Sequence, residues 1–123
     1  MTDINELEVY NLSMEIAENV WKDVIKWNYF ERDSMGKQLV RAVDSIGANI
    51  AEGFGRFHFQ ENKHFCYYAR GSLFETKTWL QKSLNRNLIT EEVFAKLNDK
   101  INLIHVKLNA YIKSIGRNYT SKK

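Results

Sequence analysis

Apolar residues recur at spacings of three and four along most of the chain, which is the period of one face of an α-helix. Four such stretches cover residues 3–28, 35–54, 60–86 and 91–115, with short polar segments between them. Short connections place consecutive helices side by side in opposite directions. The pattern therefore predicts an all-α fold, an up-down-up-down antiparallel four-helix bundle. It forms one domain over residues 1–123, with a frayed tail at 116–123.

The first expected helix has two apolar stripes. One stripe contains Leu7, Tyr10, Met14, Ala17, Trp21 and Val24, and the second contains Val9, Ile16, Val20 and Trp27. A contact between two helices needs only one such stripe. We therefore expect part of this surface to be covered by something other than a neighbouring helix.

The segment 29–34 is expected to be a loop, with Asp33 or Ser34 as the N-cap of the second helix. In that helix, Gly53 and Gly55 each lower helix propensity by about 1 kcal/mol relative to alanine. They indicate a helix end or a close contact between helices. Thr90, followed by two glutamates, is the expected N-cap of the fourth helix.

The composition supports this interpretation. The chain has no proline, six glycines and 44% hydrophobic residues, which argues against disorder and against an all-β fold with many turns. One cysteine, Cys66, cannot form an intramolecular disulfide, so we expect a reducing compartment. The N-terminal segment has no secretory signal and no stretch is long enough to span a membrane. The expected location is the cytoplasm, with no membrane partner.

Charge is distributed unevenly along the chain. Residues 1–34 carry eight acids and three bases, whereas residues 35–123 carry fifteen bases and seven acids. Lys63, Arg70 and Lys77 recur every seven residues on the third helix, with Tyr67 and Phe74 between them. Cations neutralise phosphates and aromatic rings stack on unpaired bases, so this stripe predicts a nucleic-acid interface. Further candidate contacts are Arg41, Arg56, Lys96, Lys100 and Lys107. A solvated charged face is the alternative.

Candidate chemistry is sparse. Glu61 and His64 have a Glu-x-x-His spacing, but no second such motif completes a di-metal site. Cys66 lies on an apolar line, where a free cysteine acts as a small hydrophobe. Glu52 and Glu75 are candidates for a general acid and base. We favour instead a polar cluster with Ser45, Asn49, Ser72 and nearby arginines that fixes helix register. The sequence predicts no enzyme, cofactor or metal. The aromatics Trp21, Trp27, Tyr68 and Trp79 are expected in the core.

One stretch resembles a known family. Residues 45–53, Ser-Ile-Gly-Ala-Asn-Ile-Ala-Glu-Gly, are similar to the Ser-Ile-x-x-Asn-Ile-Ala-Glu-Gly signature of a bacterial four-helix bundle family. Its members are encoded in intervening sequences of 23S ribosomal RNA genes. Residues 38–42 (Gln-Leu-Val-Arg-Ala), residues 69–75 (Ala-Arg-Gly-Ser-Leu-Phe-Glu) and the start Leu-Glu-Val-Tyr at 7–10 also agree. The resemblance covers nearly the whole chain, although many relatives have a proline in 29–34.

The resemblance implies a homopentamer with a basic surface that binds RNA or DNA. A related branch is an accessory to the reverse transcriptase of diversity-generating retroelements, so a protein-interaction scaffold is the alternative function. The motif positions are Asn49, Glu52, Gly53, Gly71, Ser72 and Glu75, and their implied role is structural. A pentamer would also account for the second stripe of the first helix, which a lone bundle would leave exposed.

Overall fold

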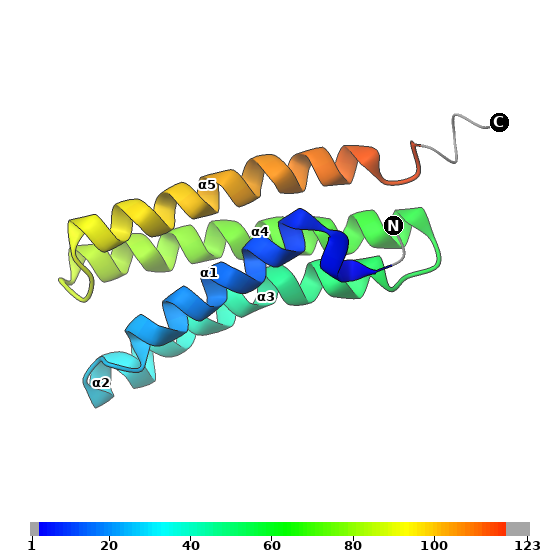
Figure 1. The fold of residues 1–123 in the computed structure, drawn as a ribbon. Helices are drawn as coiled ribbons and strands as arrows, with labels where there is room; N and C mark the ends of the chain where they lie inside the picture. The colour runs from blue at the N-terminus through cyan, green and yellow to red at the C-terminus, as the bar shows by residue number, and fades with distance from the viewer. Residues whose placement is uncertain (1–2, 118–123) are drawn as a thin grey trace.

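The computed structural model describes residues 3–117. Its four long helices are α1 (Glu8–Val24), α3 (Lys37–Phe54), α4 (Phe59–Asn85) and α5 (Glu91–Ser114). Shorter elements are a 3-10 turn η1 (Ile4–Glu6), one helical turn α2 (Tyr29–Glu31) and a π-helical segment η2 (Arg32–Gly36). The long helices alternate in direction (Figure 1), which confirms the antiparallel four-helix bundle.

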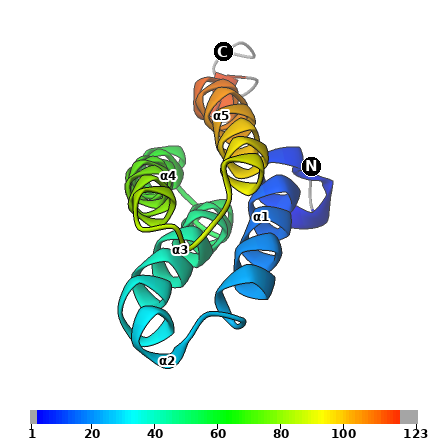
Figure 2. The same cartoon turned by 90° about the vertical axis from the view of Figure 1, so that its left-hand side faces the viewer.

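The four helices surround one apolar core. Viewed along the bundle, α3 lies between α1 and α4, and α5 lies across from α3 (Figure 2). Each long helix contributes residues at the helical spacing, including Ile16 and Val20, Val43 and Ile46, Leu73 and Leu80, and Ile101 and Ile104. No helix within residues 3–117 is both long enough and apolar enough to cross a lipid bilayer.

The structure buries residues from both stripes of α1, because Leu7, Ala17 and Val24 of the first stripe are in the core as well. The second stripe is inside the bundle: Val9, Ile16 and Val20 are at most 2% exposed, and Trp27 packs against the core. Met14 and Trp21, from the first stripe, are 45% and 51% exposed. The reason is that α1 contacts both α3 and α5, so its buried arc is wider than one stripe. The argument that a lone bundle leaves the second stripe exposed is therefore wrong.

The loop expected at 29–34 is also wrong, because helical structure begins at Tyr29 and continues through η2 into α3. Asp33 and Ser34 do not cap a helix. Asp33 instead pairs with Lys37 one turn later at 3.3 Å, and the Ser34 hydroxyl donates to the carbonyl of Phe30. The segment contains neither proline nor an interior glycine, so nothing in it stops a helix. The chain turns earlier, after α1 ends at Val24.

Several helix ends match the sequence. The Thr90 hydroxyl accepts a hydrogen bond from the backbone N–H of Val93 and caps α5 as expected. At the end of α4, Asn87 has a φ of 60°, and its N–H donates to the carbonyl of Leu84 while Leu88 donates to Ser83. This pair of bonds is a Schellman motif, which ends a helix with one left-handed residue. Of the expected tail, residues 118–123 lie outside the described residues.

Candidate nucleic-acid interface

The basic stripe lies along the seam between α4 and α5. Arg70 donates a hydrogen bond to the side-chain oxygen of Asn109 at 2.9 Å, and the Lys77 ammonium donates to Asn102 at 3.1 Å. Both asparagines are on α5 and are seven residues apart, which matches the spacing of the two cations on antiparallel α4. Helix α5 therefore orients two members of the stripe, Arg70 and Lys77.

The partners of these cations are neutral. Within residues 3–117, Arg70 and Lys77 form no ion pair with a carboxylate, and the side chain of half-buried Lys63 has neither an ion pair nor a hydrogen bond. An amide oxygen orients an ammonium or guanidinium group without cancelling its charge. All three members of the stripe thus keep a full positive charge that an anion can use.

Aromatic side chains are exposed beside the stripe. Tyr67 and Phe74 of α4 are 41% and 49% exposed. Tyr68 is 59% exposed but lies about 160° around the helix from Arg70, next to Phe65. The Arg70 guanidinium lies 5.2 Å from the centre of the Tyr67 ring, and Phe74 contacts the ring of His105 on α5 edge-on. Gly71 lies near Tyr67 and Phe74 on α4, and a Cβ built on it would meet no atom within 4 Å apart from its chain neighbours and the backbone of its own helix. We call Tyr67, Gly71 and Phe74, with the stripe Lys63, Arg70 and Lys77, the α4 face.

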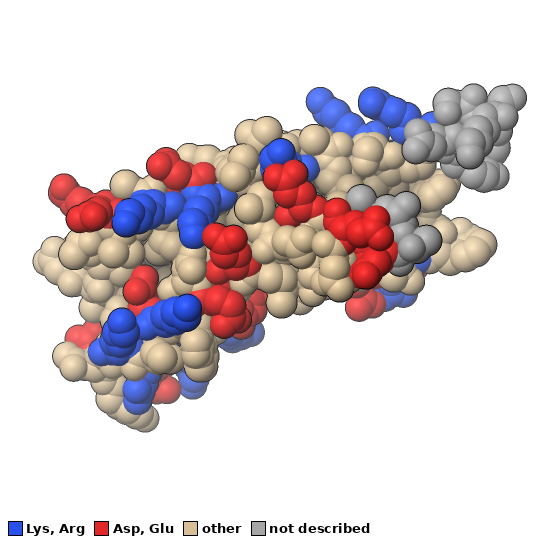
Figure 3. Space-filling model, in the orientation of Figure 1, with Lys and Arg blue, Asp and Glu red and all other residues tan. Residues whose placement is uncertain are grey.

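The structure separates most of the other predicted cations from the α4 face. Lys100 pairs with Glu15 at 3.1 Å and Lys107 pairs with Glu8 at 3.3 Å, and both bonds connect α5 to α1. Figure 3 shows this side of the molecule, where basic and acidic side chains lie next to one another along α1 and α5. These lysines therefore have less free charge than the α4 face.

The remaining three predicted cations differ in whether a carboxylate pairs with them. Arg56 bonds to Glu52 at 2.6 Å and lies 3.7 Å from Glu61, and Lys96 lies 4.0 Å from Glu92. Arg41, on α3, is exposed and has no ion pair in the described part of the chain. Among the further candidate contacts, Arg41 is thus the one whose charge is not neutralised by a described carboxylate.

The polar motif residues bond within their own helices. The Asn49 amide donates to the carbonyl of Ser45, and the Glu75 carboxylate accepts a bond from the indole of Trp79. Ser72 contributes its carbonyl, which accepts from Thr76. These bonds, like that of Glu52, connect residues one turn apart. Of the expected cluster, Arg56 alone among the described contacts of these side chains links the end of α3 to α4, through Glu52 and Glu61. Glu52 and Glu75 are both exposed.

The two motif glycines have different surroundings. A Cβ on Gly53 would lie 2.7 Å from the side-chain oxygen of Asn62 and 2.9 Å from its carbonyl oxygen. Gly53 therefore allows the close approach of α3 and α4 that the sequence indicated. Gly71 has no such reason within the chain, because nothing described lies near its missing Cβ.

Cys66 is part of the core, as predicted, and burial raises the pKa of its thiol to about 11. A thiol with this pKa is protonated near neutral pH, which is unsuited to nucleophilic catalysis. Burial also raises the pKa of Tyr111, whose hydroxyl accepts a bond from Asn62. Among residues 3–117, no group of three His, Cys, Asp or Glu side chains could hold a metal ion.

The sequence interpretation missed residues that shape this surface. Asn102, His105 and Asn109 of α5 bond to or contact Arg70, Phe74 and Lys77. Their spacing of three and four residues is visible in the sequence, and it places them on one flank of α5. The core expectation also failed for Trp21 and Tyr68, which are more than half exposed, whereas Trp27 and Trp79 pack against the core.

Comparisons with known proteins agree with the fold. A protein of unknown function from the S23 ribosomal protein family of Bacteroides thetaiotaomicron has a similar crystal structure, with a TM-score of 0.77 and 28% sequence identity. The match covers 86% of this chain and 99% of that one. No curated protein matches the chain. The sequence model of the 23S rRNA-intervening sequence protein family matches residues 5–110. The chain therefore belongs to the family of 23S rRNA-intervening sequence proteins.

Proposed function

We propose that the chain is a non-enzymatic, cytoplasmic RNA-binding protein that holds single-stranded RNA on the α4 face. One observation carries the proposal: Lys63, Arg70 and Lys77 keep their charge because their described partners are neutral amides or absent. Exposed Tyr67 and Phe74 lie beside them and offer ring surfaces for unpaired bases. DNA strands share this chemistry, so the same measurements are made with both.

Salt dependence tests the electrostatic part. Binding of a fluorescent single-stranded RNA is followed by anisotropy at several salt concentrations. Each phosphate neutralised on a single strand contributes about −0.7 to the slope of log K against log salt. The combined variant Lys63→Gln, Arg70→Gln and Lys77→Gln should bind more weakly and lower the magnitude of the slope by about 2. Affinity that does not depend on salt would refute the proposal.

The chain offers a control with the same loss of charge. Lys96→Gln, Lys100→Gln and Lys107→Gln also remove three positive charges, but these lysines have carboxylate partners on α5 or α1. We expect this variant to retain most of the affinity. Equal losses in the two variants would mean that only net charge attracts the RNA, and that the α4 face is not the site.

A second pair of variants neutralises the stripe without removing it. Asn102→Asp and Asn109→Asp replace the neutral acceptors of Lys77 and Arg70 with carboxylates of nearly the same shape. Each cation then has an ion-pair partner in place, so folding should be retained and RNA affinity should fall. Unchanged affinity would show that the free charge of these two residues is not what binds RNA.

We further propose that the protein acts as a homo-oligomer, a pentamer by the family resemblance. Exposed Met14 and Trp21 support association, as does a shallow groove of about 320 Å³ between α1 and α3 that contains Gly47, Ala48 and Ala51. Sedimentation equilibrium measures the mass directly. A species of 14.5 kDa across working concentrations would exclude the oligomer.

The second candidate function is a scaffold or accessory subunit for another protein, such as a reverse transcriptase. The same α1–α3 groove favours it, because the groove is apolar and has Glu18 and Asp44 among its lining residues. Glu8 and Glu15 do not support it, because they pair with α5 of their own chain. Charge reversal of the stripe should remove RNA binding and leave a protein partner bound if both functions exist.

A further inference from the structure

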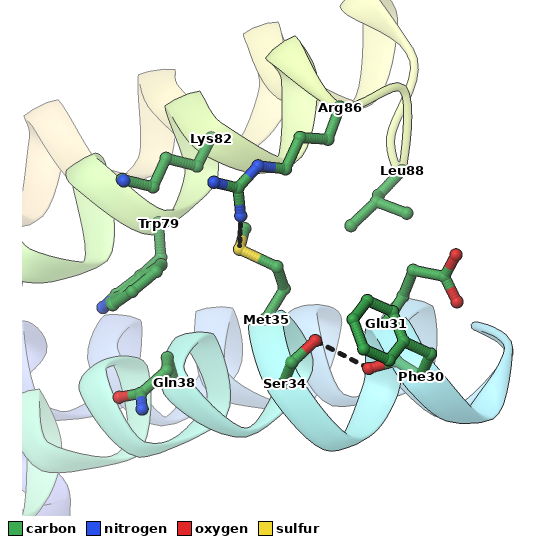
Figure 4. Close-up of a pocket in the computed structure, with 9 residues that line it drawn as sticks. All are labelled: Phe30, Glu31, Ser34, Met35, Gln38, Trp79, Lys82, Arg86 and Leu88. Atoms are coloured by element: carbon green, nitrogen blue, oxygen red, sulfur yellow. Dashed lines mark hydrogen bonds between the residues drawn. The ribbon is translucent and has the colours of Figure 1, made fainter.

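A cleft lies at the end of the bundle where α2 and η2 meet the end of α4. Its volume is about 590 Å³, within the range of small-molecule sites. Met35 is buried at its base, and Phe30, which is 77% exposed, forms one wall. Half-buried Trp79 lines the opposite side (Figure 4). The cleft thus presents two aromatic side chains that the described chain leaves partly uncovered.

Two cations lie in the same cleft. The Lys82 ammonium is 5.6 Å from the centre of the Trp79 ring, and the Arg86 guanidinium donates a hydrogen bond to the sulfur of Met35. A thioether is a weak acceptor, and a guanidinium has five N–H donors. Neither cation pairs with a carboxylate in the described part of the chain. An anionic group would therefore gain strong bonds here while displacing only a weak one.

Glu31 makes the two sides of the cleft differ in charge. Its carboxylate lines the wall beside Phe30 and Leu88, and the Arg86 guanidinium lies between that wall and Trp79 (Figure 4). Glu31 has no ion pair among residues 3–117. It repels an anion from this wall and can accept bonds from amino groups. A ligand that fits has an anionic group near Lys82 and Arg86 and an aromatic ring with N–H donors near Phe30.

From this arrangement we infer that the cleft binds a nucleotide. The phosphate lies on Arg86 and Lys82, and the base lies against Phe30 with its amino edge toward Glu31. Lys82 also lines a shallow groove with Phe74 and Lys77, so the cleft adjoins the α4 face. The ligand is either a free nucleotide or the last nucleotide of a strand, and only the strand case rests on the proposed function.

Calorimetric titration of the full chain with AMP, GMP, CMP and UMP tests the inference. Mononucleotides with an amino group on the base should bind saturably, and ribose 5-phosphate and adenosine should each bind about tenfold more weakly or worse. Equal binding of ribose 5-phosphate would mean an anion site without base recognition and would overturn the inference. So would the absence of saturation by any nucleotide at about 1 mM.

Matched variants locate the binding. Phe30→Ser and Arg86→Gln change exposed side chains and should each weaken nucleotide binding about tenfold. Phe57→Ser and Arg117→Gln are the controls, because Phe57 is 91% exposed and both lie outside the cleft. The controls should bind as the wild type does. Equal losses of nucleotide affinity in the cleft variants and the control variants would overturn the site. The site would also be overturned if a peptide with an acidic C-terminus binds this cleft and nucleotides do not.

Oligonucleotides distinguish a free nucleotide from the last nucleotide of a strand as the ligand. They also test the cleft separately from the α4 face. If a strand supplies the nucleotide, Phe30→Ser should weaken binding of single-stranded RNA as well as of mononucleotides. If the ligand is free, only mononucleotide binding should change. The Lys63, Arg70 and Lys77 variant should still bind mononucleotides in both cases. If RNA binding depends on the stripe but no mononucleotide binds, the cleft proposal alone is overturned. If mononucleotides bind in the cleft but RNA binding does not depend on the stripe, the α4 face proposal alone is overturned.

Discussion

Replacement of Gly53 by alanine should destabilise the protein through one defined contact. The added Cβ would lie 2.7 Å from the Asn62 side-chain oxygen, 2.9 Å from the Asn62 carbonyl oxygen and 2.9 Å from Cβ of Phe65. Carbon contacts are normally about 3.5–4.0 Å, so the overlap is more than half an ångström. Two of the three atoms are a backbone oxygen and a Cβ, which cannot rotate away. Helix α4 must therefore move relative to α3.

The expected magnitude is the difference of two effects. Overpacking of this kind costs about 1–3 kcal/mol, and contact with rigid atoms places Gly53 toward the upper end. Alanine recovers less than about 1 kcal/mol of helix propensity, because Gly53 is in the last turn of α3. We expect a net loss of about 2 kcal/mol in the free energy of unfolding.

Gly71→Ala is the matched control. This position is exposed in the middle of α4, and the added methyl group meets nothing within 4 Å apart from its chain neighbours and the backbone of its own helix. It should gain about 0.5–1 kcal/mol from helix propensity alone. Urea unfolding followed by circular dichroism compares both variants with the wild type at several protein concentrations, because an oligomer's stability depends on concentration. A Gly53→Ala variant as stable as Gly71→Ala would refute the close contact.

Three further outcomes are expected. Thr90→Ala should lower the free energy of unfolding by about 1 kcal/mol, since the Val93 N–H loses its cap, and an unchanged urea midpoint would contradict this. Burial raises the pKa of Cys66 from 9.0 to about 11, so the unfolded chain loses this proton first. The thiol therefore leaves stability unchanged below pH 9 and lowers it as pH rises between 9 and 11, and Cys66→Ala should flatten that decline. Lys100→Gln and Lys107→Gln should each cost less than about 1 kcal/mol in the same unfolding assay, because their ion pairs are exposed.

Periodicity was sufficient for the bundle and for most helix ends. Leu73, Leu80, Ile101 and Ile104 are buried at the spacing from which the helices were predicted, and Thr90 caps α5 through a local bond. These features depend on residues within about one turn of each other, so a single sequence contains the information.

Predictions that depended on a second helix were less successful. The two stripes of α1 were visible, but which of their residues are buried depends on where α3 and α5 approach the helix. The segment 29–34 is polar and was interpreted as a loop, yet Gly36 packs so closely that a Cβ would lie 2.7 Å from a methyl group of Val24. A tertiary contact of this kind cannot be recognised from local composition.

The two flanks of α5 show why cations at the same seven-residue spacing are neutralised in one place and keep their charge in another. Lys100 and Lys107 are seven residues apart and face Glu15 and Glu8 of α1, which are also seven apart. Asn102 and Asn109 are two positions further along, about 200° around the helix, and face Lys77 and Arg70 of α4. On one flank of α5 opposite charges cancel, and on the other an amide holds each cation without neutralising it. A stripe of cations is therefore a candidate anion site only when the facing helix supplies neutral partners.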